Sequence, residues 1–213
     1  MSSDGKRVTL LSAAEAELEE KKSIFIGYAA PVSSEEEAKA IVAEKKKEFS
    51  DATHNVWAYY IDNGIYCRYS DDGEPQGTAG IPVLNVLKMS GATDMVVVVT
   101  RYFGGTLLGA GGLVRAYSAA AKLALDAAGF AYMENYTIFE ITVSYSEYQK
   151  LADKLPKSGG IIDDVQFGED VKVICAIESE NDGVIAPLVK ELTGGRGKVE
   201  TIGVEERAAR KEN

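Results

Sequence analysis

The chain has 213 residues, of which 46% are apolar and 26% are charged, and its formal net charge is −10. These proportions are ordinary for a soluble globular protein, and the acidic balance argues against broad, non-specific binding to nucleic acid or to an anionic membrane. The two cysteines stand far apart and form neither a disulfide framework nor a CxxC motif, which favours reduced thiols in a cytoplasmic protein. No apolar run reaches membrane-spanning length and no secretory signal is visible, so we expect no membrane association.

The first half of the chain predicts strands and helices separated by clear turn signals. Ser34 and Glu37 stand in capping-box spacing, and Asn63 before Gly64 is typical of a tight hairpin. Periodicity and β-branched content predict strands over residues 23–30, 56–61, 65–69 and 95–100, and helices over residues 34–49, 78–89 and 113–128.

Residues 69–82 (YSDDGEPQGTAGIP) concentrate turn-forming residues and carboxylates. Asp, Gly and Pro supply the side-chain hydrogen bonds, the positive φ and the fixed backbone of a tight turn. The carboxylates of Asp71, Asp72 and Glu74 have three interpretations: solvated turn residues, ligands of a hard cation such as Mg²⁺ or Ca²⁺, or partners that fix nearby arginines. Residues 69–82 do not match the twelve-residue calcium loop of EF-hands. Of the three interpretations, solvated turn carboxylates are favoured.

Residues 101–118 (RYFGGTLLGAGGLVRAYS) follow the last predicted strand of this half. Arg101 and Arg115 flank a dense group of glycines: Gly104, Gly105, Gly109, Gly111 and Gly112. Such density is expected where the backbone needs positive φ or is approached closely. A helix N-terminus beside two guanidinium groups suits phosphate or carboxylate, so the stretch predicts an anion-binding cleft. Glycines that serve only close helix-to-sheet packing are the alternative.

Two standard phosphate loops do not fit this stretch. The P-loop spacing of Gly104 and Gly109 is followed by Ala110 and Gly111, where a lysine and a hydroxyl residue are needed. The dinucleotide pattern that starts at Gly109 has Val114 in place of its third glycine. The predicted cleft therefore matches neither of these nucleotide-binding loops.

After residue 134 the pattern restarts, with a second capping box at Ser144 and Glu147. Strands are expected over residues 137–143, 161–167, 171–178 and 198–204, and helices over residues 144–157 and 183–192. This βαββαβ order is that of a ferredoxin-like unit. We therefore predict an α+β protein with two domains, residues 1–134 and 135–213, that ends in a solvated or frayed segment over residues 205–211.

Three sequence blocks resemble those of the IMPACT family, in its bacterial YigZ-type branch. They are residues 54–59 (HNVWAY), 69–80 (YSDDGEPQGTAG) and 101–118, and the similarity covers about residues 20–130. The resemblance implies a first domain with the fold of ribosomal protein S5 domain 2 and a ferredoxin-like second domain. It also implies a link to translation, because eukaryotic relatives interfere with a kinase that senses uncharged tRNA. Ile81 and Leu107 stand where many relatives have lysine, which removes two candidate phosphate contacts.

Two hypotheses from different classes follow. The first is a translation-linked regulatory protein of the stress response, whose cleft binds a phosphate of RNA or the ribosome, or an acidic surface of a translation-associated protein. It needs no catalytic residue, cofactor or metal. Its candidate binding residues are Arg101, Tyr102, Gly104, Gly105, Gly109, Gly111, Gly112, Arg115, His54, Asp71, Asp72 and Glu74.

The second hypothesis is a small-molecule phosphate-binding enzyme, a transferase or hydrolase that uses the carboxylates of Asp71, Asp72 and Glu74 for acid–base chemistry. His54 is the only histidine, and neither a cysteine nor a serine elbow stands in a recognisable relation to it. We interpret His54 as a structural or pocket residue, and the binding hypothesis is favoured over the enzyme hypothesis.

Overall fold

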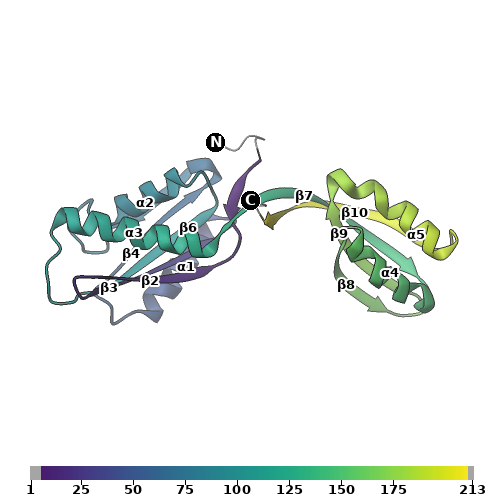
Figure 1. Ribbon diagram of the computed structural model, residues 1–213, viewed down its shortest axis with the longest axis horizontal. Helices are drawn as coiled ribbons and strands as arrows, with labels where there is room; N and C mark the ends of the chain where they lie inside the picture. The colour runs from purple at the N-terminus through teal and green to yellow at the C-terminus, as the bar shows by residue number, and fades with distance from the viewer. Residues whose placement is uncertain (1–5, 211–213) are drawn as a thin grey trace. The chain divides into compact units, whose positions relative to one another are not determined.

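The structure is a computed structural model that describes residues 6–210. It combines helices with two β-sheets, which confirms a mixed α+β fold (Figure 1). The described residues divide into two compact units: one comprises residues 6–133 and 208–210, and the other comprises Glu134–Arg207. The sequence prediction placed the boundary after residue 134 and left the whole C-terminal end in the second domain.

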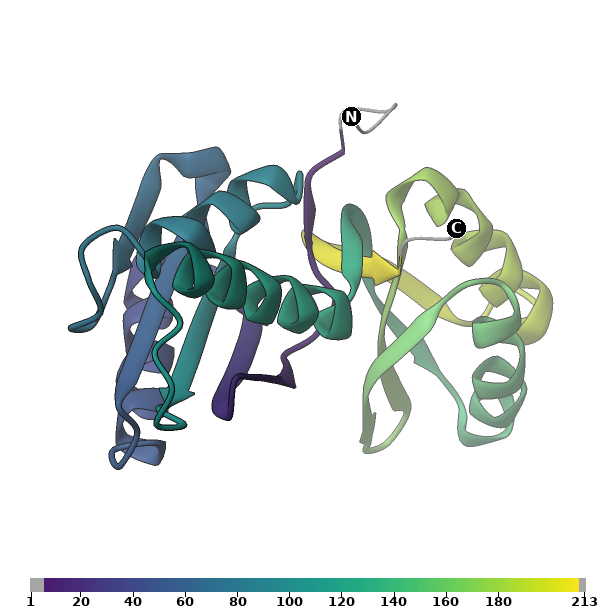
Figure 2. The same ribbon diagram turned by 60° about the vertical axis from the view of Figure 1, so that its left-hand side comes forward.

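The first unit is built on an antiparallel sheet with strand order β2-β3-β6-β4-β5. Its strands are β2 (Ala14–Glu20), β3 (Ser23–Pro31), β4 (His54–Ile61), β5 (Tyr66–Ser70) and β6 (Met95–Tyr102). Helices α2 (Gly80–Met89) and α3 (Ala110–Ala128) cover one face of this sheet, and α1 (Glu35–Glu48) covers the other (Figure 2). A short strand, β1 (Val8–Leu10), pairs with the start of β7 (Phe130–Val143).

Strand β6 is the middle strand of this sheet, and both of its faces are buried. Met95, Val97 and Val99 pack in the core under α2 and α3, whereas Val96 and Val98 pack in the core under α1. A strand covered on both faces requires an unbroken apolar run, which explains the sequence MVVVVT. The same strand carries Arg101 to the start of the glycine-rich loop.

Most of the predicted elements are confirmed, with some ends shifted. Helix α1 begins after Ser34, whose hydroxyl accepts a hydrogen bond from the Glu37 N–H, while the Glu37 carboxylate accepts from Ser33. The predicted hairpin turn contains a short 3₁₀ segment, η1 (Asp62–Gly64). Helix α3 begins three residues earlier than predicted, so Gly111 and Gly112 lie in its first turn rather than in the loop.

Strands β1 and β2 were not among the predicted elements. Strand β2 reads AEAELEE and lacks the β-branched and aromatic residues that are typical of strands. It nevertheless pairs with β3 along its whole length, with Ala14, Ala16 and Leu18 half-buried and the glutamates between them exposed. Charged side chains are tolerated there because β2 lies at the edge of the sheet.

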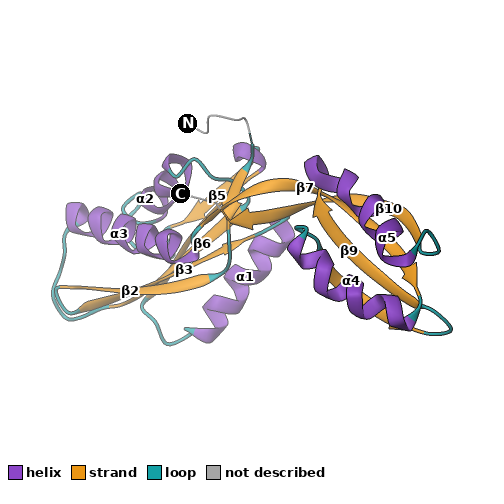
Figure 3. Ribbon diagram, turned by 45° about the vertical axis from the view of Figure 1, so that its right-hand side comes forward, coloured by secondary structure: helices purple, strands orange, loops and turns teal. Residues whose placement is uncertain are grey.

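The second unit has the predicted element order βαββαβ (Figure 3). After β7 it contains α4 (Tyr145–Lys157), β8 (Ile161–Phe167), β9 (Val171–Glu178), the 3₁₀ segment η2 (Ser179–Val184), α5 (Ile185–Thr193) and β10 (Lys198–Arg210). In its sheet β8 pairs with β9, β9 pairs with β7, and β7 pairs with β10 and, at its start, with β1; both helices pack on the same face of this sheet. The predicted capping box of Ser144 and Glu147 is present at the start of α4.

The predicted solvated or frayed C-terminal end is solvated but not frayed over the residues that the structure describes: Glu205, Glu206 and Ala208 are exposed, yet they lie in a strand. Residues 205–210 belong to strand β10, and Lys211 lies outside the described part. Arg207 donates two hydrogen bonds to the carboxylate of Asp163, at 2.9 and 2.6 Å, which ties β10 to β8. Across residues 6–210, none of the helices combines the length and the apolar character needed to span a membrane.

Candidate functional site

The three blocks that resemble the IMPACT family meet at one buried carboxylate, that of Glu74. Its Oε1 atom accepts hydrogen bonds from Arg101 Nη1 at 2.5 Å and from the Tyr117 hydroxyl at 2.7 Å, and His54 Nε2 lies 3.8 Å from the same oxygen. The side chains of Glu74 and Arg101 are only 3% and 6% exposed. We call Glu74, Arg101, Tyr117 and His54 the Glu74 network. It connects β4, the turn before α2, the end of β6 and α3.

Arg101 belongs to this scaffold rather than to an exposed cleft. Its Nη2 atom lies 3.4 Å from the Ser23 hydroxyl, and its guanidinium lies over the rings of Phe25 and Phe103 at 5.4 and 5.5 Å. Separating a buried ion pair would leave a charge in an apolar interior, so the pair fixes the local geometry. Arg101 is therefore held by internal contacts, and phosphate binding by Arg101 stays a prediction. The alternative, an arginine fixed by a turn carboxylate, describes its observed contacts.

Tyr117 and His54 complete the network from two different elements. Burial raises the pKa of Tyr117, and the nearby Glu74 carboxylate raises it further, so the phenol stays protonated and donates to Glu74. Nδ1 of His54 lies 2.8 Å from the backbone oxygen of Asp72. Both side chains are held by the protein itself, which agrees with a structural role for His54. Tyr117 was not a predicted site residue.

Asp71 and Asp72 hold the turn before α2 together. The carboxylate of Asp71 accepts hydrogen bonds from the N–H groups of Gly77, Ala79 and Gly80 at 2.8, 3.1 and 2.8 Å, and so caps the start of α2. The carboxylate of Asp72 accepts from the Asn55 N–H at 2.6 Å and from the Lys46 ammonium at 2.5 Å.

These contacts correct the interpretation of the three carboxylates as solvated turn residues. Asp71 binds backbone donors, Asp72 binds a backbone donor and a lysine, and Glu74 binds an arginine and a tyrosine. Within residues 6–210, no group of three His, Cys, Asp or Glu side chains is arranged to hold a metal ion. The turn is therefore a hydrogen-bonded scaffold that carries Glu74 into the core.

The glycine-rich loop lies directly against the turn between β2 and β3. A Cβ atom at Gly104 would stand 2.0 Å from the backbone oxygen of Lys22, and the Gly104 N–H donates to the Ser23 hydroxyl at 3.1 Å. Gly105 and Gly109 have φ values of +83° and +72°, which L-residues rarely adopt. Close approach and positive φ both explain why glycine stands at these positions. They also bring Lys21 and Lys22 beside the loop.

Helix α3 begins at Ala110 without a side-chain cap, and Gly109 is its N-cap residue. The N–H groups of its first turn therefore have no side-chain partner at the point where the helix dipole is positive. Arg115 lies along this turn, since its Nη1 atom would be 3.7 Å from a Cβ atom at Gly111. Arg115 is exposed and forms no hydrogen bond or ion pair with any residue that the structure describes.

We call Lys21, Lys22, residues 103–109 and Arg115 the glycine-loop surface. A depression of about 220 Å³ opens on it between β2 and α3. Its lining is formed by Leu18, Glu20, Lys21, Leu108, Gly112, Arg115, Ala116 and Ala119. Among the described residues, Lys21 and Lys22 have no ion-pair partner either. Three cations therefore stand around this depression without internal partners, and Glu20 is the acidic residue in its lining.

The remaining predicted residue, Tyr102, is engaged elsewhere. Its hydroxyl donates to the Asp51 carboxylate at 2.8 Å, and this hydrogen bond raises the pKa of Tyr102. The structure thus divides the predicted site into two parts: His54, Asp71, Asp72, Glu74, Arg101 and Tyr102 form internal contacts, and the glycines and Arg115 lie on or beside the glycine-loop surface. Lys21 and Lys22 were missed, because their place beside the loop depends on the unpredicted strand β2.

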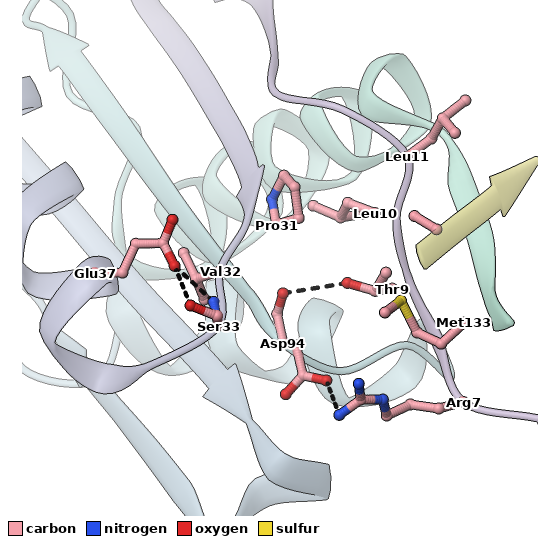
Figure 4. A pocket seen from close by; sticks show the side chains of 11 residues that line it. Arg7, Thr9, Leu10, Leu11, Pro31, Val32, Ser33, Glu37, Asp94 and Met133 are labelled. Atoms are coloured by element: carbon pink, nitrogen blue, oxygen red, sulfur yellow. Dashed lines mark hydrogen bonds and ion pairs between the residues drawn. The ribbon is translucent and has the colours of Figure 1, made fainter. Parts of the chain in front are cut away.

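A second cavity, of about 400 Å³, lies near the start of the chain (Figure 4). Its polar side chains already bind one another or the backbone: Arg7 lies 3.2 Å from Asp94, and Glu37 accepts from both the N–H and the hydroxyl of Ser33. Thr9 donates to the backbone oxygen of Asp94. None of the predicted site residues lines this cavity. The glycine-loop surface is therefore the stronger candidate for ligand binding.

Comparison with known proteins identifies two family matches. Residues 21–125 match the family described as Impact N-terminal domain, and residues 141–196 match one described as Domain of unknown function (DUF1949). A solved structure described as "Crystal structure of an hypothetical protein" is 29% identical, with a TM-score of 0.59, and covers 93% of this chain and 98% of that one. The glycine-loop surface and the Glu74 network lie within the first of the two family matches.

Three curated proteins illustrate the range of relatives. IMPACT family member YvyE of Bacillus subtilis (strain 168) is 36% identical over 192 residues, which are 90% of this chain and 88% of that protein. IMPACT family member YigZ of Escherichia coli (strain K12) is 32% identical, with coverage of 87% and 92%. Protein IMPACT homolog of Dictyostelium discoideum is 41% identical over 95 residues, which are 42% of this chain and 27% of that protein.

Proposed function

This chain belongs to the IMPACT family, and we propose that it is a translation-linked regulatory or binding protein of the cytoplasm. The site that we assign to this role is the glycine-loop surface. It would hold an anionic group, either a phosphate of RNA or the ribosome, or a carboxylate of a translation-associated protein. The link to translation rests on the family resemblance, which includes eukaryotic proteins named IMPACT.

The proposal extends to the folds of the two units. We assign the fold of ribosomal protein S5 domain 2 to the first unit and a ferredoxin-like fold to the second. The βαββαβ element order of the second unit supports its assignment, as does the packing of both helices on one face of the sheet. Fold by itself identifies no activity, so the functional argument depends on the surface.

The observation that carries the proposal is the environment of Arg115. Its guanidinium is exposed and has no partner among the described residues, and it lies beside a helix N-terminus that no side chain caps. Cationic forks and free N–H groups are both suited to phosphate and carboxylate. In a chain with a net charge of −10, such a local concentration of unpaired cations favours a specific anionic partner over general attraction.

The enzyme alternative has less support from the geometry. Asp71, Asp72 and Glu74 all accept hydrogen bonds from the protein's own donors, and the Glu74 side chain is buried. A general acid or base must reach the reacting group, and these carboxylates are already occupied.

The proposal is tested by sedimenting the protein with ribosomes over a series of salt concentrations. Wild type is compared with a Lys21→Ala/Arg115→Ala variant, whose substitutions remove exposed, unpaired cations. We expect binding to weaken with salt and to be weaker in the variant; for contacts with phosphate, the slope of log K against log salt would decrease by about one for each lost contact.

A matched control removes the same charge elsewhere. Lys150 and Lys190 are exposed cations on α4 and α5 of the second unit, and Lys150→Ala/Lys190→Ala should bind as wild type does. If ribosome binding weakened equally in both double variants, the loss would be explained by the change in net charge and not by the glycine-loop surface. Absence of binding at low salt would exclude direct contact with the ribosome. The search would then turn to protein partners.

A further inference from the structure

We propose that the glycine-loop surface receives an acidic polypeptide segment that places an aliphatic side chain next to a carboxylate. This inference rests on the proposed function, because it names the partner class of the same surface. It chooses a protein segment over RNA, and the choice depends on how apolar and charged groups are distributed around the loop.

Exposed apolar side chains gather around this loop. Leu107 is 83% exposed, Phe103 is 45% exposed and Val114 is 38% exposed. Ile24, which pairs with Tyr102 across β3 and β6, is also exposed. Single exposed apolar side chains are common on soluble proteins, but four within two adjoining segments are a concentration of the kind from which interaction sites are built.

The depression beside the loop is also lined largely by apolar side chains. Leu18, Leu108, Ala116 and Ala119 provide aliphatic carbon, and Gly112 leaves its part of the lining without a side chain. The lining has no aromatic residue. An aliphatic side chain would therefore find carbon contacts there, whereas a nucleobase would find no ring on which to stack.

The charges around the depression favour carboxylates. Lys21 and Arg115 line it, Lys22 stands next to Lys21, and Lys122 lies two turns further along the exposed side of α3. None of these cations has an ion-pair partner among the described residues, and the opposing charge in the lining is Glu20. An acidic segment complements this small positive area on an otherwise acidic protein.

The aromatic residues near the loop do not favour RNA. Phe103 has one ring face against the guanidinium of Arg101, and the Tyr102 hydroxyl is bound to Asp51. Proteins that bind single strands combine several stacking rings with a cationic groove along the backbone, because affinity increases with each neutralised phosphate. Leu107 at the loop and a few cations at the depression fit a short acidic and aliphatic segment better.

The experiment uses the full chain and three pools of probes. The first contains random dodecapeptides of Leu, Ile, Val, Asp and Glu, and the second replaces the aliphatic residues by Ser, Thr and Asn. The third contains random RNA dodecamers. The immobilised protein is exposed to each pool, and the retained fraction is measured for wild type and for the variants Leu107→Ser and Arg115→Ala.

We expect wild type to retain the acidic-aliphatic pool about tenfold more strongly than either other pool, the usual effect of one apolar anchor. Each variant should reduce this retention by about five- to tenfold. The control Ile65→Ser removes an aliphatic side chain that is 69% exposed and distant in sequence from the loop, and it should leave retention unchanged.

Three results would overturn the inference, and the first two differ in what they imply for the proposed function. If RNA or the Ser-containing pool is retained best and Arg115→Ala abolishes that retention, the partner class is wrong but an anion-binding surface stands. If no pool is retained at low salt, or if retention is unaffected by both variants, the proposed function fails with the inference. If Ile65→Ser lowered retention as Leu107→Ser does, the binding would be non-specific hydrophobic adsorption, and the inference would also be overturned.

Discussion

Arg101 and Arg115 stand fourteen positions apart at the two ends of one glycine-rich block, yet their surroundings differ completely. Arg101 is 5% exposed and pairs with Glu74 in the core. Arg115 is exposed and has no partner among the described residues. Two arginines in one motif therefore have different surroundings: one is held by an internal ion pair, and the other is exposed to solvent.

This contrast shows that residue type and spacing alone do not distinguish an arginine that is paired inside the protein from one that is exposed at the surface. Glu74, Tyr117 and Arg101 hold the ends of β6 and α3 in a fixed relation, and the loop between them carries the exposed groups. A buried network can thus position an exposed surface without touching the ligand. The two regions are expected to respond to substitution in opposite ways, the Glu74 network in stability and the glycine-loop surface in binding.

The largest effect is expected from Arg101→Ala, which leaves the Glu74 carboxylate buried without its cation. Removing one partner of a buried ion pair typically destabilises a protein by about 3–5 kcal/mol. Urea unfolding followed by the fluorescence of Trp57, the only tryptophan, reports on the first unit. Arg115→Ala is the matched control and should change the free energy of unfolding by less than about 0.5 kcal/mol.

A pairwise substitution sharpens this prediction. If the loss in Arg101→Ala comes from the uncompensated carboxylate, Arg101→Met/Glu74→Leu should be more stable than Arg101→Ala alone, because no buried charge then lacks a partner. Equal stability of Arg101→Ala and Arg115→Ala would contradict the division between scaffold and surface.

An intermediate effect is expected from Gly104→Ala. The added Cβ would meet the backbone of Lys22 at 2.0 Å, and backbone atoms do not move aside as flexible side chains do. Overpacking of this kind typically destabilises by about 1–3 kcal/mol. Gly111→Ala is the control. Gly111 lies in the first turn of α3, where an added Cβ would lie 3.7 Å from the flexible Arg115 side chain, so the variant should gain up to about 1 kcal/mol of stability. The same urea titration distinguishes the two, and a stable Gly104→Ala protein would contradict close packing of the loop.

Sequence patterns predicted most of the fold because its elements carry strong local signals. The apolar run of β6, the capping residues before α1 and α4, and the turns between β8 and β9 depend on neighbouring residues only. Strand β2 and the end of β10 escaped prediction because their charged sequences contain little β-branched content. They are strands because a neighbouring strand pairs with them, and that pairing is not encoded locally.

The candidate site was predicted as a region and not as an arrangement. The positive φ of Gly105 and Gly109 and the close packing at Gly104 could be anticipated, because glycine density reports directly on backbone conformation. The role of Arg101 was not predictable from spacing, since Glu74 is 27 positions away and Tyr117 is 43 positions from Glu74. Only the packing of α3 onto the sheet brings these side chains together.

The smallest of these effects concerns Tyr117 and depends on pH. Burial and the Glu74 carboxylate raise the pKa of Tyr117 above its usual value near 10. A group whose pKa is higher in the folded than in the unfolded state adds to the free energy of unfolding. This contribution is fully present at pH values below the pKa of the unfolded state. That contribution is lost as the pH rises from there toward the folded pKa. Tyr117→Phe should therefore destabilise by about 1 kcal/mol at neutral pH, where one hydrogen bond is lost.

The gap between wild type and Tyr117→Phe should narrow between pH 9 and pH 11, because only the wild type then favours an ionised phenol in its unfolded state. Trp57-detected urea unfolding at several pH values measures this gap. Tyr69→Phe is the matched control, because it removes the hydroxyl of a tyrosine that is 44% exposed. A constant gap for Tyr117→Phe would mean that its phenol titrates as an exposed one does. The Glu74 network would then not be the closed, buried region that distinguishes Arg101 from Arg115.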